Sequence, residues 1–171
     1  MFALPIQELK SQHDRIGFFC GIDALDSYLR ERAGQDIRSK YAVVYVQLED
    51  DGKTIAGYYT LASTSINVGA LPPELVKQLP KYPLVPATLI GRLARDQRYV
   101  GKNLGERLLV DSLRRSYEYS HRVAATAVIV EAKDESAVKF YMKYGFAPFP
   151  DQPARLFIMM STIAKLYGKN V

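Results

Sequence analysis

Three features of the chain predict a mixed α/β fold, with one main sheet and helices packed against it. Segments typical of β-strands dominate the first half of the chain, whereas strands and helices alternate in the second half. The length of 171 residues, with 48% hydrophobic and 24% charged residues, is ordinary for a protein with a substantial buried core. No internal repeat or long linker divides the chain, so we expect one domain over residues 1–171.

The first half of the chain begins with a short strand, which we expect over Leu4–Leu9. Apolar residues at helical spacing then predict a helix over Gly21–Arg38. A β-branched and aromatic run predicts a strand over Tyr41–Leu48. The dipeptide Asp51-Gly52 is typical of a hairpin turn, so the chain should return as a second strand over Thr54–Ser63.

The middle of the chain carries the central strand and the longest helix. A short helix with prolines at its start is expected over Pro72–Leu79, followed by a rigid proline-containing connection over Pro80–Pro86. The apolar run Ala87–Ala94 predicts a buried strand, and the amphipathic spacing of Glu106–Tyr119 predicts a helix.

The last part of the chain continues this alternation. Val123–Glu131 is apolar enough for a strand that is buried on both faces. A helix over Asp134–Tyr144 should be capped by its first residue and ended by Gly145. The final strand is expected over Arg155–Met160, after a proline-rich loop over Pro148–Pro153.

The segment Arg98–Gly105 joins the central strand to the amphipathic helix. It is basic and contains Gly101 and Gly105, which let the backbone approach a ligand closely. Free backbone amides at the start of a helix, together with the helix dipole, favour phosphate groups. A P-loop is disfavoured because Lys102 is followed by Asn103 instead of Ser or Thr, and a dinucleotide-binding motif would need a third spaced glycine. The turn therefore predicts phosphate or pyrophosphate binding.

The pattern Arg98-x-x-Gly101-x-Asn103-x-Gly105 resembles motif A of the GNAT acetyltransferase superfamily. The resemblance implies a single GNAT domain, whose central, mostly antiparallel sheet is flanked by helices and splayed where the co-substrate acetyl-CoA binds. In that family the amides of the turn hold the pyrophosphate of acetyl-CoA, and strand amides hold the oxyanion of the reaction. Asn103 stands where the family has Gly or Ala. The implied cofactor-binding residues are Leu93, Ala94, Arg98, Val100, Gly101, Lys102, Asn103, Leu104, Gly105 and Phe140.

A second match lies downstream, in the segment from Ala137 to Phe146. It resembles the late helix of the GNAT family, whose tyrosine commonly protonates the departing thiolate of CoA. The resemblance implies that Tyr141 is the catalytic residue. The chain has 12 tyrosines, so packing is the alternative role for Tyr141, and packing is the role expected of Tyr144.

Further matching residues extend over nearly the whole chain: Phe19–Leu29, Ala33, Gln35, Asp36, Ile90–Ala94, Tyr144–Phe146, Pro153 and Arg155–Phe157. With these residues the chain resembles, more narrowly, the GNAT toxins of bacterial type II toxin–antitoxin modules. It implies transfer of an acetyl group to the α-amino group of the amino acid on charged tRNA, which blocks translation. It also implies a small ribbon-helix-helix antitoxin as partner, repression of operator DNA by the complex, and a homodimer.

The charge of the chain agrees with a polyanionic partner. The net charge is +5, from 23 Lys and Arg against 18 Asp and Glu, and the cations crowd the first quarter and the surroundings of the turn. Such runs of charge ordinarily form a solvated surface. The more specific interpretation is that they bind a polyanion larger than one nucleotide. The predicted tRNA-binding residues are Arg30, Arg32, Arg38, Arg92 and Arg95.

The acceptor chemistry needs no strong base. A free α-amino group has a pKa of about 7.7–8.0, against about 10.4 for lysine, and an aminoacyl ester lowers it further. Neither His13 nor His121 falls in a motif, and Glu131 is a candidate proton relay. Two alternatives stay open: a GNAT enzyme that acts on a small amine or a protein amine, and a non-catalytic acyl-CoA-binding regulator.

The remaining expectations concern metals and location. No group of His, Cys, Asp and Glu has the spacing of metal ligands, so we expect no metal. Cys20 is the single cysteine, which excludes an intramolecular disulfide, agrees with a reducing compartment and suggests a small buried hydrophobe. No apolar run approaches the length of a membrane span, so a cytoplasmic protein is expected.

Overall fold

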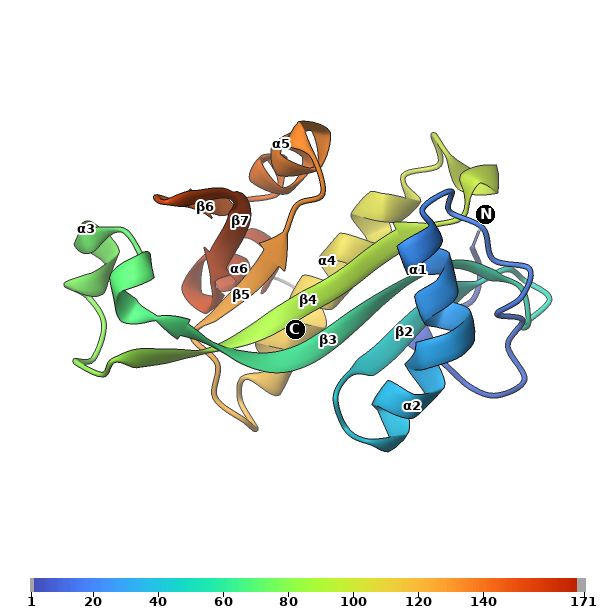
Figure 1. The fold of residues 1–171 in the computed structure, drawn as a ribbon, viewed down its shortest axis with the longest axis horizontal. Helices are drawn as coiled ribbons and strands as arrows, with labels where there is room; N and C mark the ends of the chain where they lie inside the picture. The colour runs from blue at the N-terminus through green and yellow to red at the C-terminus, as the bar shows by residue number, and fades with distance from the viewer. Residues whose placement is uncertain (1, 169–171) are drawn as a thin grey trace. The chain divides into compact units, whose positions relative to one another are not determined.

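The computed structural model describes residues 2–168, in which seven strands form one sheet of order β1-β2-β3-β4-β5-β7-β6 (Figure 1). The pairs β1–β2, β2–β3, β5–β7 and β6–β7 are antiparallel, and this mixed architecture confirms the predicted fold class. Contacts divide the chain into two compact units. Unit 1 holds the residues up to Ala62 and Ile90–Ser112, and unit 2 holds Ser63–Leu89 and the residues from Leu113 onward.

Unit 1 begins with β1 (Gln7–Glu8) and a continuous helical segment. This segment consists of α1 (Asp23–Ser27), a π-helical turn (Tyr28–Arg32) and α2 (Ala33–Arg38). The helix predicted over Gly21–Arg38 is confirmed, apart from the π-helical turn at its centre. Such turns are rare and occur frequently at functional sites.

The predicted hairpin of unit 1 is also confirmed. It joins β2 (Val43–Leu48) to β3 (Ile55–Asn67), which runs beyond its expected end into unit 2. The Asp51 carboxylate fixes the turn by accepting hydrogen bonds from the backbone amides of Lys53 and Thr54, both at 2.9 Å.

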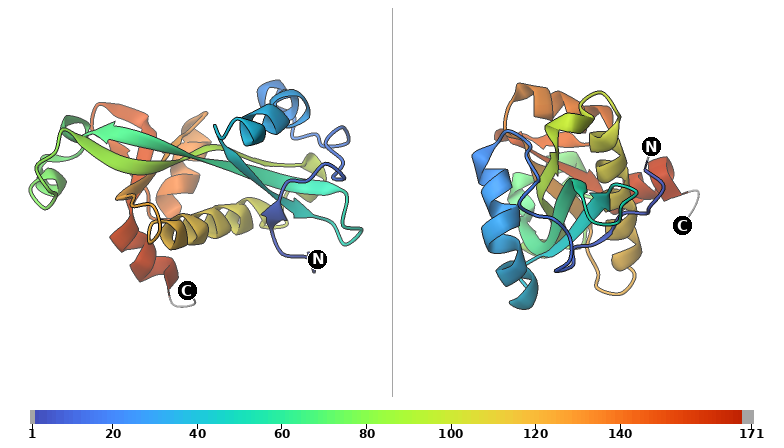
Figure 2. Two further views of the ribbon diagram at one scale, coloured as in Figure 1. Left: turned by 90° about the horizontal axis from the view of Figure 1, so that it is seen from below. Right: turned by 90° about the vertical axis from the view of Figure 1, so that its right-hand side faces the viewer.

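The core of unit 1 lies between its helices and strands. The segment α1–α2 covers one face of the strands, and the first half of α4 (Leu104–Tyr119) covers the opposite face (Figures 1 and 2). β4 (Leu84–Arg95) contributes its second half to this unit. The buried core residues include Phe18, Tyr28, Leu29, Val44, Val46, Leu48, Ile55, Tyr58 and Ala94.

Unit 2 has its own core, formed by residues of both its segments. Its α5 packs against β6 and β7, and its α6 packs against β7. The elements are α3 (Pro73–Val76), β5 (Ala127–Glu131), α5 (Glu135–Lys143), β6 (Ala147–Phe149), β7 (Gln152–Met159) and α6 (Met160–Tyr167). The buried core residues are Ile66, Leu71, Val85, Ala87, Ala127, Ile129, Phe149 and Phe157.

The expected connection over Pro80–Pro86 was wrong at its end, because β4 already begins at Leu84. Val85 and Ala87 are buried while Leu84 and Pro86 are exposed, which is the alternation of a strand with one buried face. The prolines had suggested a connection instead of a strand. Proline lacks an amide donor, but the carbonyl of Pro86 accepts a hydrogen bond from the amide of Thr126 at 2.8 Å.

Expectations for the end of the chain needed three further corrections. The predicted loop over Pro148–Pro153 instead holds parts of β6 and β7. The helix α6 was not expected. β5 begins at Ala127, four residues later than predicted, since Val123 lies outside the strand and is 76% exposed.

Candidate functional site

The turn between β4 and α4 has the backbone of an anion-binding loop. Gly101 has φ +78° and Asn103 has φ +59°, so both lie in the left-handed region. Glycine adopts this region freely, and asparagine is one of the few other residues that enters it readily. Asn103 therefore gives the backbone the conformation that glycine would give at the same place. The fully buried side chain of Leu104 fixes the start of α4 directly afterwards.

Several backbone amides of this turn are available to a ligand. The amide of Lys102 donates to the Tyr99 carbonyl at 3.2 Å and so closes the turn. Within residues 2–168, no acceptor is recorded for the amides of Gly101, Asn103 or Gly105. These donors lie at the positive end of a 16-residue helix. The arrangement suits a phosphate or pyrophosphate group.

Asp96 supports the turn through hydrogen bonds, a role that was not predicted from the sequence. Its Oδ1 accepts the Arg98 amide at 2.9 Å and Arg98 Nε at 3.0 Å. Its Oδ2 accepts Arg98 Nη2 at 3.0 Å and the Phe19 amide at 2.9 Å. The Asp96 side chain is 3% exposed, whereas that of Arg98 is 52% exposed. An aspartate just before a helical turn is a known capping signal, and it could have indicated this role.

The charge of Asp96 is stabilised despite its burial. Burial alone would raise the pKa of Asp96, but the hydrogen bonds from Arg98 and from the Phe19 amide outweigh it and hold the pKa below its usual value. In return, the amide of Gln97 donates to the Phe19 carbonyl at 3.0 Å. This reciprocal pair of hydrogen bonds ties the segment that leads into α1 to the turn.

Tyr141 lies in unit 2, on α5, and is 9% exposed. Its ring makes edge contacts with Phe140 and Phe146, at centroid distances of 5.3 and 5.4 Å. Burial raises the pKa of Tyr141 to about 12. The phenol therefore stays protonated throughout the physiological range, where it can donate a proton or a hydrogen bond but does not act as a base.

The ends of α5 are fixed as predicted. Asp134 caps the helix by accepting the Ala137 amide at 2.8 Å, and Gly145, with φ +103°, follows its last turn. Tyr144 is engaged in packing: its ring lies 5.1 Å from that of Phe140, and its carbonyl accepts the Tyr167 hydroxyl at 2.7 Å.

The predicted cofactor-binding residues lie on three elements. Leu93 and Ala94 are near the end of β4, half-buried and buried respectively. The residues from Arg98 to Gly105 form the turn described above, in unit 1. Phe140 precedes Tyr141 on α5 in unit 2.

The five predicted tRNA-binding arginines belong to unit 1, and one of them differs from the rest. Arg92 stacks on Tyr28, with its guanidinium carbon 3.6 Å from the ring centroid. The Tyr28 hydroxyl donates to Asp36 at 2.9 Å, and burial together with this bond raises the pKa of Tyr28 to about 12. Arg92 is thus half-buried and held in place by a cation–π contact. The exposed arginines of the set are Arg30, Arg32, Arg38 and Arg95.

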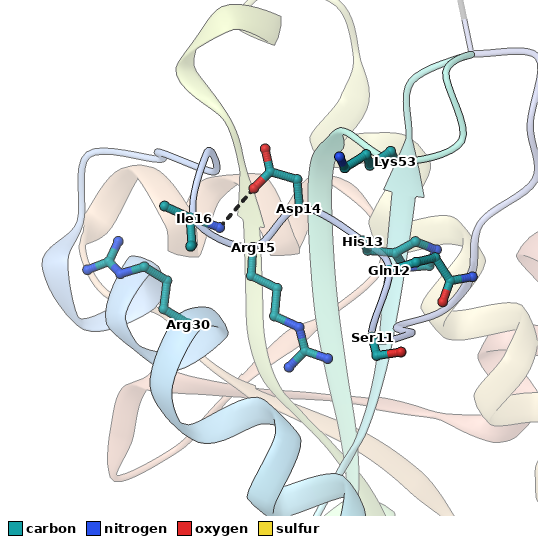
Figure 3. A pocket seen from close by; sticks show the side chains of 8 residues that line it. All are labelled: Ser11, Gln12, His13, Asp14, Arg15, Ile16, Arg30 and Lys53. Atoms are coloured by element: carbon teal, nitrogen blue, oxygen red, sulfur yellow. Dashed lines mark hydrogen bonds between the residues drawn. The ribbon is translucent and has the colours of Figure 1, made fainter.

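A polar pocket of about 560 Å³ lies beside the helical segment of unit 1 (Figure 3). Arg30 comes from the π-helical turn, Lys53 comes from the hairpin, and the other lining residues come from the loop 11–16. His13 Nδ1 accepts the Lys10 amide at 3.0 Å, which places the proton of the neutral ring on Nε2. Burial lowers the pKa of His13, and the charges of Lys10 and Arg15 lower it further.

Residues 2–168 show neither a cluster of metal-ligating side chains nor a membrane-spanning helix. These residues contain no group of three or more His, Cys, Asp and Glu side chains placed to hold a metal ion. In the same part of the chain, no helix is both long and apolar enough to cross a membrane.

Curated relatives match the chain over nearly its full length, although no protein-family profile matches it. It is 35% identical over 165 residues to the probable toxin TacT of Sinorhizobium fredii, covering 92% of this chain and 91% of the relative. It is 29% identical over 162 residues to the tRNA-acetylating toxin of Mycobacterium tuberculosis, covering 95% of each chain.

Solved structures of similar fold hold an acetylated tRNA, acetyl-CoA, or an antitoxin with DNA. AtaT complexed with acetyl-methionyl-tRNA has a TM-score of 0.88 and 28% identity, over 95% of this chain and 98% of that chain. AtaTR bound with acetyl-CoA has a TM-score of 0.82 and 27% identity, over 95% and 97%. The complex of AtaT with its antitoxin AtaR, bound to DNA, has a TM-score of 0.78 and 26% identity, over 96% and 99%.

Proposed function

Because the chain belongs to the family of GNAT acetyltransferase toxins that includes TacT, we propose that it acetylates charged tRNA. It transfers the acetyl group of acetyl-CoA to the α-amino group of the amino acid that the tRNA carries, and so blocks translation. The observation that carries this proposal is the match over nearly the full length to a tRNA-acetylating toxin, together with a turn in unit 1 in which Gly101 and Asn103 have positive φ.

The turn binds the pyrophosphate of acetyl-CoA through its backbone. The amides of Gly101, Asn103 and Gly105 supply donors, and the α4 dipole adds favourable potential. Arg98 adds a positive charge that Asp96 holds beside the turn. Lys102 and the neighbouring Val100 and Leu104 complete this part of the site, and Phe140 contributes an apolar surface for the cofactor.

The acyl transfer proceeds through a tetrahedral oxyanion. The neutral α-amine attacks the thioester carbonyl, and the carbonyl oxygen takes up the negative charge. The attacking nitrogen then loses its extra proton to solvent, the carbonyl re-forms as an amide, and the C–S bond breaks to release the CoA thiolate. Strand amides near Leu93 and Ala94 stabilise the oxyanion, for which one well-placed donor is worth about 2.7–4 kcal/mol.

Tyr141 supplies the proton for the departing thiolate. Its pKa of about 12 exceeds that of a free thiol, about 8.5, so transfer to a fully solvated thiolate would be uphill. The apolar surroundings that raise the pKa of Tyr141 also raise that of a thiolate released beside it, which narrows this gap. A strong hydrogen bond and partial transfer in the transition state then suffice.

The proposed partners follow from the same family. The chain acts as a single GNAT domain in the cytoplasm, where charged tRNA and acetyl-CoA are present. A ribbon-helix-helix antitoxin neutralises it, and the toxin–antitoxin complex binds operator DNA, as the AtaT–AtaR complex binds DNA. The toxin itself is a homodimer.

The experiment that tests the proposed function compares two pools of the same tRNA. Purified protein is incubated with labelled acetyl-CoA and either aminoacylated or deacylated tRNA. We expect label in the charged pool alone, because only that pool offers an α-amine. Equal labelling of both pools, or labelling of a protein or small amine in preference to charged tRNA, would contradict the proposal.

A further inference from the structure

The cations around the pocket of unit 1 outnumber the carboxylates that line it. Arg15, Arg30 and Lys53 line it, and Asp14 is the acidic residue among the lining side chains. Asp14 Oδ1 already accepts the backbone amides of Ile16 and Gly17, at 3.2 and 3.1 Å. Within residues 2–168, none of the three cations is recorded in an ion pair.

A second observation, at Gly34 of α2, extends the cationic region along the helix. Arg15 Nη1 lies 3.4 Å from the point where a Cβ on Gly34 would stand, and Arg38 Nη1 lies 3.2 Å from the same point. Two guanidinium groups therefore both lie near the same glycine. Like charges so placed repel each other unless an anion lies between or beside them. The acidic residue Asp36 of this helix is engaged by the Tyr28 hydroxyl.

We propose that Arg15, Arg30, Arg38 and Lys53, here named the basic surface, bind successive backbone phosphates of the substrate tRNA. The proposal rests on the proposed function and adds to it a contact with the body of the tRNA. Arg15 and Lys53 extend the set that the sequence alone indicated.

The layout of the basic surface fits a chain of phosphates better than a single small anion. Its cations come from a loop, a helix and a hairpin, and Arg15 and Arg30 extend in different directions (Figure 3). Separated cations of this kind match the regular charges of a nucleic-acid backbone.

The other lining residues favour RNA over an acidic peptide. Ser11, Gln12 and His13 offer polar groups that can reach ribose hydroxyls or phosphate oxygens. Ile16 is the single apolar residue of the lining, whereas a peptide partner would need apolar pockets for anchoring side chains.

A matched pair of substitutions at Gly34 tests the basic surface. Gly34→Glu adds a carboxylate to the side chain that starts beside Arg15 and Arg38, and Gly34→Gln adds an uncharged side chain of the same shape there. Both residues favour a helix more than glycine does, so neither variant should unfold α2. The affinity for deacylated tRNA is measured for both variants between about 0.05 and 0.3 M salt.

We expect the Glu variant to bind tRNA about tenfold more weakly than the Gln variant. The slope of log affinity against log salt concentration should also be shallower, by the amount that about one or two phosphate contacts contribute. A double variant, Arg15→Ala with Arg38→Ala, should behave like the Glu variant. Acetyl-CoA affinity and melting temperature report that each variant is folded.

Three results would decide against the proposal or separate it from the proposed function. Equal tRNA affinities of the Glu and Gln variants would overturn the basic surface. Loss of polyglutamate binding in the Glu variant, with tRNA binding intact, would also overturn it and assign the surface to an acidic peptide. If tRNA binding depends on the surface as expected but charged tRNA is not acetylated, the surface stands and the proposed function fails.

Discussion

The turn before α4 and the helix α5 serve the proposed reaction in different ways. The turn offers backbone amides, which every residue type carries, so its function depends on conformation at Gly101 and Asn103 and on the support of Asp96. Helix α5 offers one side chain, the phenol of Tyr141, in surroundings that keep it protonated. A substitution in the turn should therefore act through geometry and binding, whereas a substitution at Tyr141 should act on the chemical step.

The largest effect is expected for Tyr141→Phe. Removing the hydroxyl takes away the proposed proton donor, so kcat for charged tRNA should fall about 10²–10⁴-fold with little change in the acetyl-CoA affinity. Tyr144→Phe is the control, because it removes the same hydroxyl group from a neighbouring tyrosine whose ring packs against Phe140. Steady-state kinetics on both variants make the comparison. Unchanged turnover in Tyr141→Phe would remove the tyrosine from the mechanism.

The next effect is expected for Asp96→Asn, which tests the support of the turn. An amide cannot accept all four hydrogen bonds that Asp96 accepts, so the free energy of unfolding should fall by about 1–3 kcal/mol and the KM for acetyl-CoA should rise. Because the folded-state pKa of Asp96 is below its unfolded value, the stability it contributes is present above pH 4 or so and is lost as the pH falls further.

Thermal melting of Asp96→Asn and of the parent protein, measured from about pH 3 to pH 7, checks this prediction. The difference between them should shrink as the parent's own carboxylate becomes protonated. An equal difference at all these pH values would show that the charge of Asp96 is unimportant for the fold.

A smaller effect is expected at Asn103, where the backbone has φ +59°. Asn103→Gly should keep the acetyl-CoA affinity, because glycine adopts this conformation without strain. Asn103→Val should weaken binding roughly tenfold, since a β-branched residue pays about 1–2 kcal/mol in the left-handed region. Isothermal titration with acetyl-CoA measures both. Similar affinities for the Gly and Val variants would mean that the conformation of this residue does not govern binding.

The smallest effect is expected in the pH dependence of the reaction, which distinguishes an aminoacyl α-amine from a lysine amine as the acceptor. For an aminoacyl acceptor, kcat/KM should rise with pH as the α-amine loses its proton and should be level from about pH 8 upward, where the amine is neutral. Tyr141 should produce no decline in this range, because its pKa of about 12 keeps it protonated. A rise that continues toward about pH 10 would instead indicate a lysine acceptor.

Local signals allowed much of the fold and the turn to be predicted. The helical spacing of Gly21–Arg38, the Asp51-Gly52 hairpin and the Asp134 cap all depend on residues close together in sequence, and all three were confirmed. The start of β4 was missed because its prolines suggested a connection. The roles of residues in the reaction stay predictions.

Features that depend on distant residues could not be predicted. The Asp96 carboxylate reaches the amide of Phe19, which is 77 positions away, and no pattern near either residue indicates this contact. Arg15 and Arg38 both lie near Gly34 only because the loop 11–16 folds against α2. The stacking of Arg92 on Tyr28 likewise joins a strand to a helix far apart in the chain.

Mass spectrometry of the aminoacyl end of charged tRNA tests the central claim most directly. The charged tRNA is incubated with acetyl-CoA and either the parent protein or the Tyr141→Phe variant, and is then digested. The mass of its terminal aminoacyl-nucleotide is measured, and fragmentation locates the modified atom. We predict one added acetyl group on the α-nitrogen with the parent protein and little or none with the variant. An unmodified α-amine after incubation with the active parent protein, or an acetyl group elsewhere on the RNA, would contradict the account.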